Sequence, residues 1–269
     1  MTTSAAVYGA FVRNKVLESL AFRTRFVVGI PSYFMFVAVH FFIWRAVYAA
    51  SPQPEIAGYD LGQILTYMAV AWMIRSFYFS RVDHEIAEDV RQGNVVRHLL
   101  RPVDYQAARM AEAFGESAFR LLALTLPSAV LVYLFFPVAP PAGWAAAGAF
   151  AASLLLSFVL FFELSYLAGL SAAFTENAAG LLRAKAAAVE LLSGLLVPLS
   201  FFPPWAETLL EWLPFRAIAD VPLNLYLGRY AGEEVLLMLA LQAAWALGLY
   251  LVGRWMWDVV VRRLTIQGG

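Results

Sequence analysis

Long runs of apolar residues dominate this sequence, and their lengths are the first indication of its fold. A helix needs about 20 mostly apolar residues to cross roughly 30 Å of hydrocarbon. Six stretches meet this requirement, at residues 26–49, 61–80, 117–136, 144–171, 186–202 and 235–257. The fifth is the weakest, since Arg183, Lys185 and Glu190 lie around its start and Pro198 lies inside it. The pattern predicts an all-α membrane protein with six transmembrane helices.

Composition agrees with lipid as the solvent for much of the surface. Of the 269 residues, 62% are hydrophobic and 14% are charged, whereas soluble domains are about 45–50% apolar and about 25% charged. Nineteen basic residues balance nineteen acidic ones, so no general positive field attracts nucleic acid and we expect no nucleic-acid partner. The absence of cysteine excludes disulfides and thiolate metal sites.

The distribution of basic residues predicts an orientation. Six spans place both termini on one side, and that side receives nearly all Lys and Arg that lie outside the spans. The other side receives only Arg216 and Arg229. Because cytoplasmic segments carry an excess of basic residues, we expect a multi-pass protein of the cytoplasmic (inner) membrane with both termini in the cytoplasm.

Two flanking segments have patterns of their own. Before the first span, one helical stripe carries apolar side chains at Tyr8, Phe11, Val12, Val16 and Leu20. This stripe predicts an amphipathic helix in the cytoplasmic interface, whereas a disordered tail would fit residues 1–5 alone. Residues 203–224 are too apolar for a solvated loop and too rich in proline to span. We expect short re-entrant helices there, covered by protein.

Catalytic motifs are missing from the sequence. His84 and Glu85 begin like the zinc-protease motif H-E-x-x-H, but Glu88 occupies the position of the second histidine. A P-loop is also absent, because Gly-Lys does not occur. We therefore expect no catalytic residue, no metal site and no cofactor in this chain, and no ATP hydrolysis by this chain alone.

Three polar residues inside the predicted spans are candidates for a functional role: His40, Arg75 and Glu163. Arg75 lies near the end of its span, so we expect its long side chain to extend toward the headgroups. His40 is expected to be a packing residue. Glu163 lies deeper and either pairs across helices or faces a hydrated cavity.

The cytoplasmic loop 81–116 carries the most informative pattern. Val82, Ile86 and Val90 repeat every four residues, which predicts a helix with an apolar ridge. An acidic flank accompanies the ridge, at Asp83, Glu85, Glu88 and Asp89. Four carboxylates disfavour a helix that rests on an anionic leaflet, so we expect this helix to bind a soluble partner.

The second half of the loop predicts a reversal and a new helix. Gly93 and Asn94 stop the first helix. A short apolar face follows at Val95, Val96, Leu99 and Leu100. Pro102 ends it, and Asp104 is placed to cap the helix that leads into the third span.

These residues carry a resemblance to a known family. Residues 88–94 (E-D-V-R-Q-G-N) and 99–105 (L-L-R-P-V-D-Y) resemble the D-[IV]-R-x-G … L-L-[RK]-P-[VL]-D signature of type-2 ATP-binding-cassette (ABC) transporter permeases. Within that family the chain resembles a branch once described as a domain of unknown function and later grouped with multidrug-type exporters. The six-span plan is similar over the whole chain. The connection Ala172–Ala184, with Thr175-Glu176-Asn177, departs from the pattern.

The resemblance implies a non-catalytic subunit of an ATP-driven exporter for a lipophilic or drug-like substrate. Two permease chains, identical or not, would pair in the bilayer and bind two copies of a separate ATPase, which holds ATP and Mg²⁺. Residues 81–101 would form the coupling helix that contacts the ATPase, and the N-terminal helix would be a connecting helix. The implied contacts are the packing residues Val82, Ile86 and Val90 and the charged residues Glu85, Glu88, Asp89 and Arg91.

Two other functions stay open at this point. A secondary transporter or membrane-embedded enzyme would use Glu163 and His40, but matching broken helices in two halves are not evident. The other is a membrane anchor for a signalling complex, which does not transport a substrate. Removal of the ATPase separates the first alternative from an exporter, and substrate-stimulated ATP hydrolysis separates the second.

Overall fold

The computed structural model describes residues 4–100, 102–175 and 177–267. These residues fold almost entirely into helices, together with a short antiparallel hairpin of β1 (Glu55–Ile56) and β2 (Tyr59–Asp60). The helices are α1 (Ser4–Ala21), α2 (Arg23–Ala50), α3 (Leu61–Tyr78), α4 (Val82–Arg91), α5 (Val95–Leu99), α6 (Tyr105–Arg120), α7 (Leu126–Phe135), α8 (Trp144–Leu170), α9 (Ala178–Leu192), α10 (Pro204–Glu211), α11 (Asp220–Tyr226) and α12 (Glu233–Gln267). The all-α prediction is confirmed.

Four helical segments in the described residues are long and apolar enough to cross a membrane: Phe26–Ala50, Tyr105–Phe135, Trp144–Ala173 and Glu233–Arg263. The first, third and fourth match the predicted spans 26–49, 144–171 and 235–257. The second extends the predicted span 117–136 toward the N-terminus, because α6 continues through a π-helical segment (Leu121–Thr125) into α7. The predicted loop therefore ends at Asp104, which caps α6 as expected by accepting from the Ala107 amide at 2.8 Å.

The other two predicted spans differ from these four. The predicted span 61–80 is a helix, α3, but it is shorter, at 18 residues, and most of its residues are buried among the other helices. The predicted helix 186–202 is wrong in its bounds. The chain is already helical from Ala178, where the Asn177 side chain caps α9 by accepting from the Gly180 amide at 3.0 Å. That helix ends at Leu192, because Gly194 takes a left-handed conformation with φ +84°.

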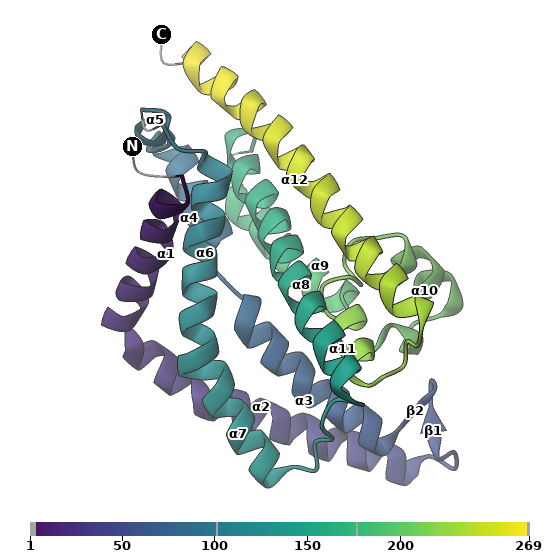
Figure 1. Cartoon of the computed structure of the whole chain (residues 1–269). Helices are drawn as coiled ribbons and strands as arrows, with labels where there is room; N and C mark the ends of the chain where they lie inside the picture. Colours follow the sequence, from purple (N-terminus) through teal and green to yellow (C-terminus); the bar gives the residue numbers. More distant parts are fainter. Residues whose placement is uncertain (1–3, 101, 176, 268–269) are drawn as a thin grey trace.

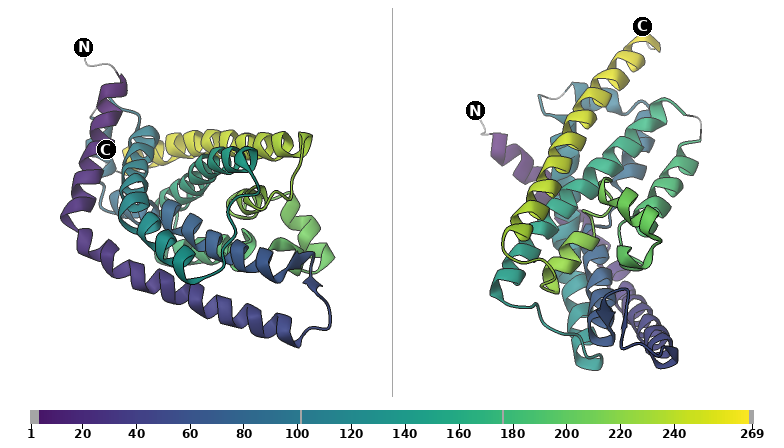
Figure 2. Two further views of the ribbon diagram at one scale, coloured as in Figure 1. Left: turned by 60° about the horizontal axis from the view of Figure 1, so that its bottom comes forward. Right: turned by 90° about the vertical axis from the view of Figure 1, so that its right-hand side faces the viewer.

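The core of the bundle lies around α3. Its fully buried residues include Ile64, Tyr67 and Ile74. The apolar side chains of α8 and α11 belong to the same buried cluster. Figure 2 shows α2 and α12 on opposite sides of this core, and both carry exposed apolar side chains such as Phe42 and Leu251. Apolar residues on an outer surface are typical of helices that face lipid.

The two ends of the bundle differ in character. One end carries α4 and α5 together with the start of α1 and the last turns of α12 (Figure 1). The other end carries the β1–β2 hairpin, α10 and α11 (Figure 1). The short helices expected in residues 203–224 are present as α10 and α11, which are separated by turns. Helix α11 is buried along its whole length, whereas α10 exposes Trp205 and Leu209, and a re-entrant path stays a prediction. The start of α1 and the last turns of α12 thus share one end of the molecule with α4 and α5.

Candidate functional site

The apolar ridge of α4 faces the interior of the bundle. Val82, Ile86 and Val90 are 3%, 0% and 5% exposed, and the helix packs against α8. The contact is close because α8 has a glycine there: a Cβ at Gly169 would lie 2.7 Å from the Ile86 Cβ. The helix and its ridge are as predicted. In this structure these side chains hold α4 to α8, and their implied contact with an ATPase stays a prediction.

Asp83 anchors α4 to α9. Its carboxylate is buried, and Oδ2 lies 2.7 Å from Nζ of Lys185 in α9. Lys185 also donates to the Ser165 hydroxyl at 3.0 Å and lies over the Phe161 ring. Burial by itself raises the pKa of Asp83, but Lys185 and His84 outweigh it and lower the pKa below its ordinary value. Asp83 is therefore a charged partner inside the protein.

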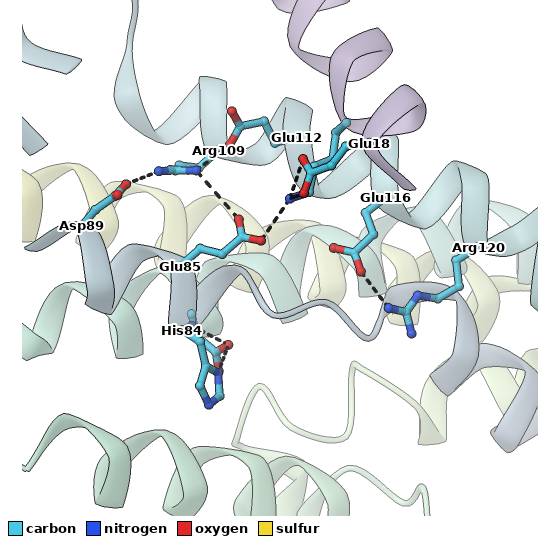
Figure 3. Close-up of polar contacts among 10 residues, drawn as sticks. Glu18, His84, Glu85, Asp89, Arg109, Glu112, Glu116 and Arg120 are labelled. Atoms are coloured by element: carbon cyan, nitrogen blue, oxygen red, sulfur yellow. Dashed lines mark hydrogen bonds and ion pairs between the residues drawn. The ribbon is translucent and has the colours of Figure 1, made fainter. Parts of the chain in front are cut away.

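Glu85 and Asp89 connect α4 to α1 and α6. Glu85 Oε1 lies 3.0 Å from Nζ of Lys15 in α1, and Glu85 Oε2 lies 3.8 Å from Nη1 of Arg109 in α6. Asp89 is ion-paired with the same Arg109 and accepts from the Tyr105 hydroxyl at 3.2 Å. Figure 3 shows Arg109 between Asp89 and Glu85. Both carboxylates were expected to meet basic residues of an ATPase, but in this structure their partners belong to the same chain.

Both lysines of the chain form ion pairs with carboxylates of α4. Lys15 and Lys185 are its only two lysines, and each is paired with a carboxylate of α4. Burial lowers the pKa of Lys15, but Glu85 and Glu18 outweigh it, so the net pKa lies above its ordinary value. Helix α4 is thus held by α1, α6, α8 and α9.

Helix α1 reaches α4 because it packs closely on α6. A Cβ at Gly115 of α6 would lie 2.5 Å from the Val12 carbonyl oxygen. Most of the predicted stripe, Tyr8, Phe11, Val12 and Val16, is partly buried, whereas Leu20 is 45% exposed. The predicted helix is present, and the partly buried part of its stripe covers α6, while its place in the cytoplasmic interface stays a prediction.

The outward surface of this region is formed by a smaller set of residues. Glu88 and Arg91 are exposed on α4. The chain reverses at Gly93, which has φ +71° as a helix stop requires. After the reversal Val96, Leu99 and Leu100 are 50%, 42% and 82% exposed. We define Glu88, Arg91, Val96, Leu99 and Leu100 as the docking face. Arg101, the last residue of the predicted coupling region, lies outside the described residues.

The three polar candidates in the spans have partners within the bundle. Nδ1 of His40 lies 2.9 Å from the Phe36 carbonyl oxygen of its own helix. Arg75 was expected to extend toward the headgroups, but it is ion-paired with Glu190 of α9, and its Nε lies 3.2 Å from that carboxylate. Glu163 is fully buried and accepts from the Gln106 amide at 2.7 Å. Glu163 therefore has a partner across helices, the first of its two predicted environments.

Sequence reasoning missed the basic partners of α4, namely Lys15, Arg109 and Lys185. The available signal was the excess of carboxylates on a helix whose apolar ridge has to be buried. Carboxylates beside a buried ridge require partners nearby, and the two lysines stand out because they are so few. Because all three basic residues are far from α4 in the sequence or on another helix, their spacing does not indicate which carboxylate each of them contacts.

The comparison with known families agrees with this architecture. The family model described as ABC-2 family transporter protein matches residues 34–268. No curated protein is matched by the sequence. The match covers most of the chain, including the long apolar helices and the loop with α4 and α5. The chain therefore belongs to the ABC-2 family of transporter proteins and is a multi-pass membrane subunit.

Proposed function

We propose that this chain is the permease subunit of an ATP-driven exporter and that a separate ATPase binds its docking face. The observation that carries the proposal is the docking face itself, where Leu100 is 82% exposed beside the charged residues Glu88 and Arg91. Membership in the ABC-2 family implies an ATPase partner in general. Exposed apolar residues within a charged rim are typical of a protein interface.

The proposed topology has six spans with both termini in the cytoplasm. Helix α3 would be the second span, shielded from lipid by its neighbours, and α9 with the non-helical segment 193–202 would be the fifth. Non-helical backbone at membrane depth is tolerated where protein covers it, and Leu195 and Leu199 are 1% and 4% exposed. The shared end of α1, α4 and α12 (Figure 1) supports a common side for both termini.

The ion pairs of α4 supply a mechanism for coupling. ATP binding acts on the permease only through contacts that differ between two states. A force on the docking face would move α4, and α4 is joined to α1 by Glu85, to α6 by Asp89 and to α9 by Asp83. The movement would thus reach both early and late helices of the chain. Glu85 and Asp89 act within the permease in this proposal, while Glu88 and Arg91 contact the ATPase.

The complete assembly in this proposal contains two permease chains and two ATPase copies. The second permease is either a copy of this chain or a non-identical one, and the ATPase supplies the site for ATP and Mg²⁺. Export of a lipophilic substrate follows from the resemblance of residues 88–105 to exporter permeases. Stimulation of ATP hydrolysis by such compounds in the reconstituted assembly tests that substrate class.

The docking experiment uses the tagged full-length chain and co-purification of the ATPase in mild detergent. Leu100→Asp should abolish co-purification while the amount and melting temperature of the permease stay unchanged, because Leu100 packs on little of its own chain. Phe174→Asp is the matched control, since Phe174 is also exposed but lies between α8 and α9. Undiminished co-purification with Leu100→Asp, or equal loss with Phe174→Asp, contradicts the proposed docking face.

A further inference from the structure

A polar cavity of about 210 Å³ lies at the end of the bundle opposite to α4. Its walls come from β2, α10, α11 and the segments that flank α11 (Figure 1). The volume is far above the roughly 10–15 Å³ that one water molecule requires and below the roughly 300–1,000 Å³ of pockets for drug-sized ligands. The cavity has the size for a small polar molecule.

One side of the cavity carries a buried carboxylate that forms no ion pair in the described part of the chain, and the nearest positive charge that acts on it is that of Arg216. Asp220, at the start of α11, is 5% exposed. Its Oδ1 accepts from the Tyr67 hydroxyl at 3.3 Å and from the Leu199 amide at 3.5 Å, and both donors are uncharged. Within residues 4–100, 102–175 and 177–267, the ion pair of the neighbouring Arg216 goes to Glu211 and none reaches Asp220. A buried carboxylate gains stability from a cation that a ligand brings.

Another side of the cavity presents guanidinium donors. Nη2 of Arg216 donates to the Tyr230 hydroxyl at 3.1 Å, and Nη1 lies 3.7 Å from the Glu211 carboxylate. Its Nε is buried and has no hydrogen-bond acceptor in the described part of the chain. A second guanidinium, that of Arg229, lies 4.0 Å above the centre of the Tyr59 ring. Guanidinium groups bind carboxylates through paired hydrogen bonds.

The mixture of charges decides which ligand chemistry fits. The lining contains Asp220, Glu207 and Glu211 as well as Arg216 and Arg229. A ligand with one sign of charge would meet a like charge, and an apolar ligand would remove water from buried ions without replacing it. We propose that this cavity binds a small zwitterion of the amino-acid or short-peptide class, with its ammonium group at Asp220 and its carboxylate at Arg216.

The proposal concerns binding alone and is independent of the ATPase. Titration calorimetry on the purified full-length chain compares L-alanine and alanyl-alanine with their half-ligands, ethylamine and acetate. At least one zwitterion should bind. Each half-ligand should bind with an affinity at least about tenfold lower, because it lacks one charge-assisted contact. Absence of binding by both zwitterions up to about 10 mM, or equal binding by a half-ligand, overturns the proposal.

Two substitutions locate the site. Arg216→Gln and Asp220→Asn should each weaken zwitterion binding about tenfold, whereas the control Glu55→Gln, on the exposed hairpin at the same end, should leave it unchanged. Equal affinity in all variants places the ligand elsewhere and overturns the proposal. If Asp220→Asn fails to fold, Arg216→Gln and the half-ligands still decide. Co-purification of the ATPase should be unaffected by Arg216→Gln, which keeps this test separate from that of the docking face.

Discussion

Lys185 of α9 and Asp83 of α4 form a buried ion pair, with 2.7 Å between Nζ and Oδ2 and side chains that are 12% and 5% exposed. The two residues are 102 positions apart in the sequence, and their helices lead to opposite ends of the molecule. Helix α9 continues toward α10 and α11 (Figure 1), whereas α4 carries Glu88 and Arg91 of the docking face. This pair therefore joins the proposed ATPase-binding region to the region of the polar cavity.

Breaking this ion pair should cost much stability. Asp83→Asn leaves the Lys185 ammonium buried without a counter-ion, which typically costs about 3–5 kcal/mol in free energy of unfolding. The double variant Asp83→Asn/Lys185→Met removes that unpaired charge and should be more stable than the sum of the single effects predicts. Unfolding in SDS measures the free energy of unfolding of the wild type, the two single variants and the double variant. Strict additivity would show that the two charges do not interact.

The same pair predicts a dependence on acid. The pKa of Asp83 is lower in the folded protein than its ordinary value of 3.8, so ionised Asp83 stabilises the fold above that value and the contribution is lost as pH falls through the lowered pKa. The stability difference between wild type and Asp83→Asn should therefore be constant above about pH 5 and shrink below pH 3.8. Thermal unfolding from pH 3 to pH 7 measures it. A difference that shrinks near neutral pH would contradict the assignment.

Gly169 should be required for the contact between α8 and α4. A Cβ there would lie 2.7 Å from the Ile86 Cβ and 2.9 Å from the Asp83 carbonyl oxygen, and overpacking of this kind costs about 1–3 kcal/mol. Gly169→Ala should lower the melting temperature and the ATPase activity of the assembly. Gly148→Ala in the same helix is the control, because no atom lies within 4 Å of its added Cβ. Equal melting temperatures for the two variants would refute this role.

A comparable substitution should loosen α1. A Cβ at Gly115 would lie 2.5 Å from the Val12 carbonyl oxygen, whereas Gly9 has free space. Because the chain has no cysteine, Ala111→Cys provides a unique thiol one turn before Gly115, at a position that is 9% exposed. Maleimide labelling of that thiol should accelerate roughly tenfold or more with Gly115→Ala and stay unchanged with Gly9→Ala. Equal rates would show that α1 does not depend on this contact.

The elements that the sequence predicts well are those with a local cause. The apolar runs give the bounds of α2 and α8 nearly correctly and the start of α12, since lipid selects apolar residues along a whole helix, whereas α12 continues ten residues beyond the predicted end at residue 257. Gly93 and Asp104 mark a turn and a cap, and both are present. Asp104 marks the start of α6, but the apolar pattern begins the span only at residue 117, because the first turns of α6 carry charged residues, among them Arg109, which is ion-paired with Asp89 of α4.

The elements that the sequence predicts poorly depend on contacts with residues that are distant in the chain. The acidic residues of α4 predict a binding surface for another protein, yet three of them form ion pairs within the chain. The apolar pattern begins the fifth span later than α9 begins, because the first residues of α9 include Arg183 and Lys185 and charged segments are atypical of a span. The ion pair with Asp83 neutralises the charge of Lys185, so this residue can lie in a helix of the bundle. No spacing rule links residues so far apart.

The ion pair between Arg75 and Glu190 has a consequence for how the protein is made. These residues are 115 positions apart, so α3 is synthesised long before the helix that neutralises its arginine. During that interval the partly buried Arg75 has no carboxylate partner from α9. We infer that α3 enters the bilayer late or remains beside water until α9 emerges from the ribosome. A chain truncated before α9 would then leave its second hydrophobic segment uninserted.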